Sequence, residues 1–172
     1  LIKEADILFS FSHLRKDFST ILIGSTILNI INRLFEEEYP QEIIFRLTYK
    51  VLNQLSGDKE QSKILFIFFL FHLSKQLGFM PNIDRCNSCN SIFKHDAIFS
   101  LRSNSLLCSN CSINNSLDTD FVLTYESLKN CLLINTTHIN SIEDIKMSFH
   151  NCQELYNFLI SFMNSNINNM HK

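Results

Sequence analysis

Apolar residues follow helical spacing along most of the chain, with one central stretch that lacks it. Between residues 12 and 35 they recur on two faces, which predicts a central helix with neighbours on more than one side and Ser12 as its N-cap. Residues 41–55 and 59–77 carry the same kind of pattern, and Pro40 suits the first turn of the second helix. The pattern predicts a mainly α-helical protein.

The third of these helices has sequence signals at both ends. Asp58 and Gln61 resemble a capping box, and Gly78 and Pro81 follow the last apolar residue. Its apolar run covers residues 64–71, whereas a bilayer span needs roughly 20 apolar residues. The run therefore predicts a buried core helix and no membrane segment.

Helical spacing returns beyond residue 118. Thr124 can cap a short helix that reaches Ile134, and Ser141 with Asp144 can cap a final helix whose apolar positions begin at Ile145. The polar end, residues 164–172, is expected to fray.

The stretch without helical spacing contains four of the six cysteines. Cys86 with Cys89, and Cys108 with Cys111, form two Cys-x-x-Cys pairs separated by eighteen residues. This spacing predicts a four-cysteine Zn²⁺ site, because each turn supplies two sulfurs and a hairpin between the pairs brings them together. Four thiolates leave no open position on a tetrahedral ion. We therefore expect one structural zinc ion, whose loss unfolds the ribbon, whereas the long helices could survive it.

The residues between the pairs agree with a small ribbon. "AIFSL" and "SLLC" predict two short strands joined through residues 102–104. The sequence thus predicts a helical bundle with an inserted four-cysteine zinc ribbon that contains a short β-hairpin. We expect helices in residues 1–83, the ribbon in residues 84–113, and C-terminal helices in residues 114–172 that pack on the first half.

Other readings of the cysteines fit less well. A thioredoxin-like redox site needs one pair in a strand–helix context, and chance clustering of core cysteines does not explain the zinc spacing. His95 can replace a thiol, but with four cysteines present a surface position is the better interpretation. Cys131 and Cys152 fall at apolar helical positions, where we expect ordinary buried thiols.

The charge of the chain gives little support to nucleic-acid binding by this region alone. A net charge of -2 and a pI of about 6.3 lack the basic bias of a self-sufficient DNA-binding domain. Arg85, Lys94 and Arg102 are weak candidates for nucleic-acid contacts, and Asp84 and Asp96 offset them. An alternative function is a stand-alone zinc-ribbon regulator that binds duplex DNA through these three residues.

Enzymatic motifs are lacking in the sequence. There is no Gly-rich phosphate loop, nucleophile elbow or His-Glu-x-x-His, and the expected metal site is closed. We therefore expect a protein that is not an enzyme. No signal peptide opens the sequence, which indicates a cytoplasmic protein, and there paired thiols more often bind metal than form disulfides.

At residues 77–90, "LGFMPNIDRCNSCN" resembles the junction between helix and first cysteine pair in the bacterial RecO family. "SLLCSNC" is similar to that family's second pair, and the preceding helices resemble those of the family as well. RecO proteins also carry an N-terminal OB-fold of roughly eighty residues, and this chain begins about where that barrel would end. The resemblance implies the C-terminal helical and zinc-ribbon region, without the OB-fold.

The resemblance also implies a function in DNA repair. RecO proteins are recombination mediators of the RecF pathway, located in the bacterial cytoplasm and associated with the nucleoid. They bind single- and double-stranded DNA, anneal strands, pair with RecR, and help load RecA onto DNA coated with single-stranded DNA-binding protein. The helical region is implied to receive the acidic, hydrophobic tail of that coating protein in an apolar pocket with basic neighbours.

Three residues depart from the family pattern. Asn90, Asn104 and Ser105 stand where the family commonly has glycine. Glycine serves there for left-handed backbone, and asparagine is the next best tolerated residue. The zinc assignment is compatible with these changes.

Overall fold

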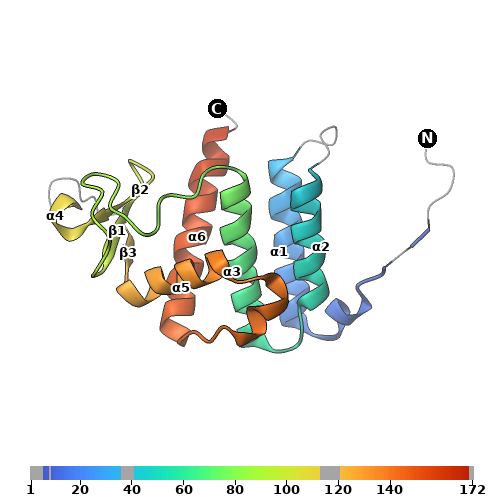
Figure 1. The fold of residues 1–172 in the computed structure, drawn as a ribbon. Helices are drawn as coiled ribbons and strands as arrows, with labels where there is room; N and C mark the ends of the chain where they lie inside the picture. The colour runs from blue at the N-terminus through green and yellow to red at the C-terminus, as the bar shows by residue number, and fades with distance from the viewer. Residues whose placement is uncertain (1–5, 8, 36–40, 113–120, 171–172) are drawn as a thin grey trace.

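The computed structural model describes residues 6–7, 9–35, 41–112 and 121–170, excepting the side chains of 167–170. Figure 1 shows a row of helices with a small sheet at one end. The elements in chain order are η1 (Ser12–Lys16), α1 (Phe18–Leu34), α2 (Glu42–Gln54), α3 (Lys59–Gln76), β1 (Ala97–Ser100), β2 (Ser105–Cys108), α4 (Ser109–Ser112), β3 (Phe121–Leu123), α5 (Tyr125–Thr136), η2 (Ile139–Asp144) and α6 (Phe149–Met170).

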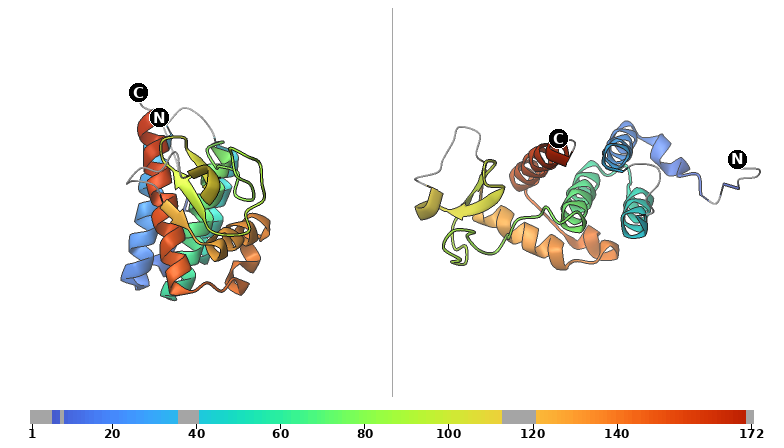
Figure 2. Two further views of the ribbon diagram at one scale, coloured as in Figure 1. Left: turned by 90° about the vertical axis from the view of Figure 1, so that its left-hand side faces the viewer. Right: turned by 90° about the horizontal axis from the view of Figure 1, so that it is seen from above.

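Helix α3 is the centre of the row. It contacts α1, α2, α5 and α6, and both figures place it between α6 on one side and the pair α1 and α2 on the other (Figures 1 and 2). Its apolar run, residues 64–71, is buried throughout, which confirms the prediction of a core helix. Among the described helices, none is both long and apolar enough to cross a membrane.

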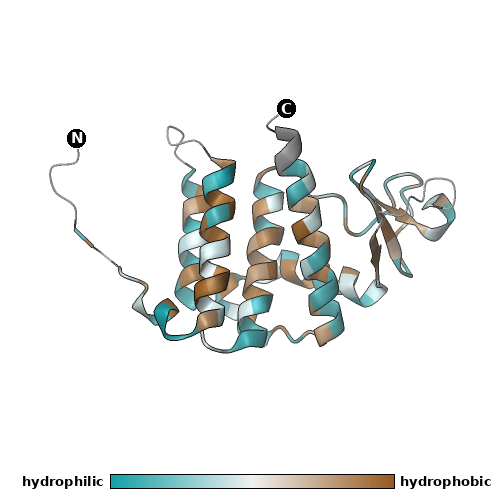
Figure 3. Cartoon of the chain, turned by 180° about the vertical axis from the view of Figure 1, so that it is seen from behind, coloured by the Kyte–Doolittle hydropathy of each residue, from teal (hydrophilic) through white to brown (hydrophobic). Residues whose placement is uncertain are grey.

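Helix α1 does not have the central position that its two apolar faces predicted. It lies at the outer end of the row, where Phe18, Leu22 and Leu28 are exposed. Apolar positions recur along α1 and α2 in the view from behind (Figure 3). The longer apolar run of α3 occupies the centre instead, because it has no polar face to turn toward water.

The start of α1 also differs from the prediction. Ser12 begins the 3₁₀ turn η1, and the N-cap of α1 is Asp17, whose carboxylate accepts from the backbone N–H groups of Ser19 and Thr20. The prediction of Ser12 as N-cap was therefore wrong. An ionised carboxylate satisfies two free amides of the first turn, which makes Asp17 a strong cap.

Two other predicted caps are confirmed. The Asp58 carboxylate accepts from the N–H groups of Glu60 and Gln61 at the start of α3, and the Thr124 hydroxyl accepts from the Ser127 N–H at the start of α5. The Gln61 amide nitrogen is buried without a hydrogen-bond partner among the described residues. Gly78, with a φ of +73°, ends α3 as expected. Pro40 lies outside the described residues.

The final helix begins later than predicted. Ser141 and Asp144 belong to the 3₁₀ turn η2, and α6 begins at Phe149, where the Ser148 hydroxyl accepts from the Asn151 N–H. The prediction placed the cap seven residues, about two helical turns, too early because η2 also buries apolar residues that mimic helical spacing. Helix α6 continues to Met170. The expected fraying from residue 164 stays a prediction.

A three-stranded antiparallel sheet forms the ribbon, with the strand order β2-β1-β3. Strands β1 and β2 make the predicted hairpin, in the register Ala97↔Cys108 to Ser100↔Ser105, and β3 pairs with the other edge of β1. The mainly helical fold with a hairpin in the cysteine region is thus confirmed. The sequence analysis missed β3, which is only three residues long.

The two asparagines at glycine positions have left-handed backbone, as the family pattern predicted. The φ of Asn90 is 58° and that of Asn104 is 49°. Ser105 instead begins β2 and is extended, so the position needs no glycine here.

Candidate metal centre

The first cysteine pair lies on a tight turn after α3. The Cys86 N–H donates to the Ser91 carbonyl at 2.9 Å, and the Asn90 N–H donates to the Cys86 carbonyl at 2.9 Å. Asn90 closes the turn because its left-handed backbone reverses the chain. This local folding directs Cys86 and Cys89 toward the same point.

The second pair comes from the end of β2. Cys108 is the last residue of β2, and Cys111 lies in the short helix α4 that follows. Two hydrogen bonds join the turns: the Asn87 N–H donates to the Leu106 carbonyl at 2.9 Å, and the Cys108 N–H donates to the Cys86 sulfur at 3.3 Å. The hairpin therefore brings the two pairs together, as the spacing predicted.

The four sulfurs form a compact cluster. The ligand atoms of Cys86, Cys89, Cys108 and Cys111 all lie within 4.8 Å of one another, and the Cys89 and Cys108 sulfurs are 3.8 Å apart. In a tetrahedral site with metal–sulfur distances of about 2.3 Å, neighbouring sulfurs are about 3.8 Å apart. The cluster therefore can hold a metal ion. His95 is exposed and does not belong to it.

Hydrogen bonds perturb the thiols of this cluster. The Ser91 hydroxyl and N–H lower the pKa of Cys89 to about 6. Burial raises the pKa of Cys86, but backbone N–H groups, the Cys108 N–H first among them, outweigh it and lower the pKa overall. The Ser88 hydroxyl lowers the pKa of Cys111, but the sulfurs of Cys108 and Cys89 outweigh it and raise the pKa to about 12. A bound metal must therefore displace protons from the cluster.

The other two cysteines lie in the helices. Cys131 on α5 and Cys152 on α6 are both buried, as predicted. Burial raises the pKa of the Cys131 thiol to about 12, so it stays protonated and unreactive at neutral pH.

A second site, which the sequence analysis did not locate, is an apolar pocket between α1, α3 and α6. Its volume is about 330 Å³. Apolar side chains of all three helices line the pocket, together with two lysines of α3, Lys59 and Lys63. The Lys63 ammonium lies 5.1 Å from the centre of the Phe149 ring. No short motif could reveal this pocket, because its residues come from three separate helices.

Residues 15–172 match the family model described as "Recombination protein O C terminal". The chain belongs to this RecO family. The resemblance found in the sequence is thereby confirmed.

Individual relatives are similar at low identity, and each bears the name DNA repair protein RecO. The protein of Listeria welshimeri is 23% identical over 110 residues, covering 64% of this chain and 42% of that protein. The protein of Chlorobium limicola is 33% identical over 86 residues, covering 50% and 33%. That of Syntrophomonas wolfei is 26% identical over 160 residues, covering 92% and 62%. The matched part is therefore less than two thirds of the length of these RecO relatives.

The basic residues of this RecO-family ribbon do not form one cluster. Arg85 is half-buried, lies 3.8 Å from the Asp84 carboxylate and donates to the Asn90 carbonyl at 3.3 Å. Lys94 precedes β1 and Arg102 follows it. The four residues of this strand lie between them, and at about 3.3 Å per residue they span about 13 Å. Both are exposed, and Arg102 lines a polar groove of about 430 Å³ with several serines.

Proposed function

We propose that the chain is the helical and zinc-ribbon part of a RecO recombination mediator, and that it acts as a scaffold and docking surface without catalysing a reaction. The match to the RecO family over residues 15–172 carries this proposal. In this function the longer protein binds single- and double-stranded DNA in the bacterial cytoplasm, anneals strands with RecR and helps load RecA. Residues 1–83 and 114–172 supply the helices, and residues 84–113 supply the ribbon, to which β3 (Phe121–Leu123) adds its third strand.

In this proposal, Cys86, Cys89, Cys108 and Cys111 hold one structural Zn²⁺. Four cysteine sulfurs are the soft ligand set that zinc prefers in closed sites, and the separations in the cluster fit tetrahedral coordination. A zinc ion here would crosslink the first turn to the end of β2. It would have no open position for substrate.

The pocket between α1, α3 and α6 is the best candidate for the tail of single-stranded DNA-binding protein. Its apolar walls, including Phe66 and Tyr156, suit the hydrophobic part of such a tail. Lys59 and Lys63 suit the acidic part, because opposite charges at the rim orient an acidic peptide. Charge and shape thus agree with the partner that the family implies.

Peptide binding tests this function. A fluorescent peptide with the tail sequence should bind the zinc-loaded protein, and Lys63→Glu should weaken the affinity at least about tenfold, a value typical of one charge reversal beside a bound acid. Lys94→Glu, an equal charge change on the ribbon, should leave affinity unchanged. Absence of binding at high micromolar peptide, with the helical circular dichroism intact, would count against peptide docking.

The alternative function, duplex DNA binding by the ribbon, is favoured only by the exposed Arg102 in its polar groove. It predicts duplex binding by this chain alone that falls steeply with salt, and that disappears when Arg85, Lys94 and Arg102 are all replaced by alanine. Duplex binding that the triple replacement leaves unchanged would exclude this function.

A further inference from the structure

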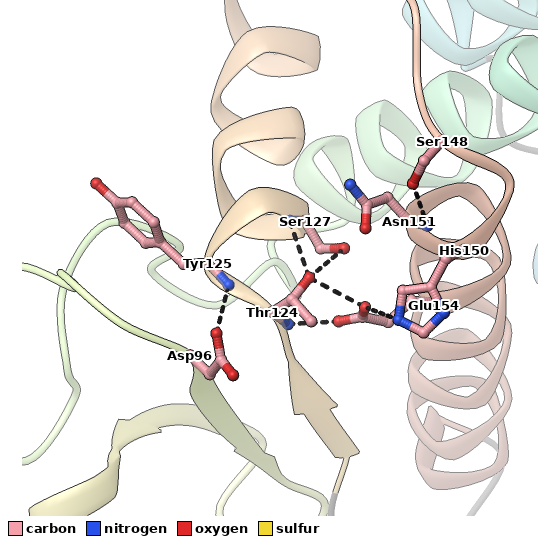
Figure 4. A network of polar contacts seen from close by, with 8 residues as sticks. All are labelled: Asp96, Thr124, Tyr125, Ser127, Ser148, His150, Asn151 and Glu154. Carbon is pink, nitrogen blue, oxygen red and sulfur yellow. Dashed lines mark hydrogen bonds and ion pairs between the residues drawn. The ribbon is translucent and has the colours of Figure 1, made fainter.

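Polar contacts join the N-terminal half of helix α6 to the ribbon. The Glu154 side chain is only 13% exposed, and its carboxylate accepts from the Thr124 N–H at 2.5 Å and from the Thr124 hydroxyl at 3.1 Å. Thr124 joins β3 to α5, and the next N–H, that of Tyr125, donates to the Asp96 carboxylate just before β1 at 2.8 Å (Figure 4). One short segment therefore links the ribbon sheet, α5 and α6.

Aromatic packing continues this connection along α6. Phe99 of the central strand β1 is fully buried, with its ring centre 4.9 Å from that of Phe158 and 5.5 Å from that of Phe162. Both ring pairs meet edge to face, a favourable geometry. The inner face of the sheet and this face of α6 thus share one apolar core.

A paired amide contact reaches the C-terminal half of α6. Asn104 in the hairpin turn and Asn166 of α6 each donate to the other's side-chain oxygen at 3.3 Å. The Asn166 amide also donates to the Phe162 carbonyl at 2.8 Å, which holds the side chain in place. Contacts with the ribbon therefore extend over three turns of α6, from Glu154 to Asn166.

The first turns of α6 also form a wall of the apolar pocket. Phe149, Cys152 and Tyr156 line the pocket, while Glu154 and Phe158 belong to the side that meets the ribbon. We infer that the metal centre controls the order of α6 through these contacts, and thereby the affinity of the pocket. The effect on peptide affinity rests on the proposed function, but the effect on α6 does not.

The physical basis is the small size of the ribbon. A module below about 40 residues rarely folds without a metal, a disulfide or a partner surface. When four thiolates lose their ion, the free energy that metal binding supplied to folding is lost with it. The ribbon then releases Phe99 and Thr124, and α6 loses its partners on one face. The long helices would therefore not be independent of the zinc site.

Hydrogen exchange of the backbone amides measures this coupling directly. Removal of Zn²⁺ from the protein with a chelator should accelerate exchange in α6 at least about tenfold, while α2, which packs mainly on α3, changes little. Accelerated exchange confined to residues 84–112, with α6 unchanged, would overturn the inference.

A variant that keeps the zinc but breaks the connection provides the sharper test. The double variant Glu154→Gln, Asn166→Ala should retain one Zn²⁺ per chain, yet its α6 should respond less to the chelator than that of the native protein. Asn164→Ala, an exposed position on the same helix, is the matched control and should respond as the native protein does. An equal chelator response in the double variant and the control would refute the role of these contacts.

Peptide affinity separates this inference from the proposed function. If the tail peptide binds the zinc-loaded protein, its affinity should fall at least about fivefold after chelation, in parallel with α6 exchange. If the peptide never binds while α6 still responds to zinc, docking fails and the coupling stands. If the peptide binds equally with and without zinc, the coupling to the pocket fails and docking stands.

Discussion

Replacing Phe99 by alanine should destabilise the helices as well as the ribbon. The ring is 0% exposed and fills the space between β1 and α6. The variant loses the burial free energy of the ring, about 2–3 kcal/mol. The cavity that the missing ring leaves, about 80 Å³, costs about 2 kcal/mol more at roughly 24 cal/mol per Å³. The free energy of unfolding should therefore fall by about 4 kcal/mol, a large part of the 5–15 kcal/mol typical of a domain.

Urea denaturation followed by helical circular dichroism measures this effect on the zinc-loaded protein. The midpoint should move to lower urea, with an unchanged slope if ribbon and helices unfold together. Val122→Ala, on the exposed face of β3, is the matched control and should change stability by no more than about 0.5 kcal/mol. A helical transition that Phe99→Ala leaves in place would show that the ribbon contributes nothing to the helices.

Other predictions concern the cluster and the asparagines. Cys108→Ser should abolish stoichiometric zinc, measured by metal analysis, and unfold the ribbon. Zinc affinity should rise with pH through the neutral range, measured by competition with a chelator, because binding displaces the proton from Cys111, whose pKa is raised to about 12. Asn104→Gly keeps the left-handed backbone but loses the amide pair with Asn166. Asn90→Gly, which relaxes the same backbone strain, is the control. The free energy of unfolding in urea should be about 1 kcal/mol lower for Asn104→Gly than for Asn90→Gly.

The features that the sequence predicted well depend on neighbouring residues. The first cysteine turn is closed by hydrogen bonds within a few residues, and the caps at Asp58 and Thr124 act within one helical turn. A local pattern therefore specifies them nearly completely. The hairpin follows for the same reason, because its turn is short and flanked by apolar residues.

The features that the sequence missed depend on distant residues. Strand β3 owes its conformation to pairing with β1, more than twenty positions earlier, and three residues are too few to show alternation. Ser141 and Asp144 match a capping signal locally, but burial of Ile139 and Ile142 against the core favours a 3₁₀ turn there. The pocket combines three helices that no linear motif connects.

The same distinction bears on the role of the metal. Taken alone, the spacing of the four cysteines predicts a self-contained ribbon, whose unfolding would leave the helices folded. The contacts of Phe99, Glu154 and Asn166 are not local, and they join that ribbon to the helix that borders the pocket. A site that is closed to substrate can therefore still influence binding elsewhere, because the free energy of metal binding is shared with every element that folds against the ribbon.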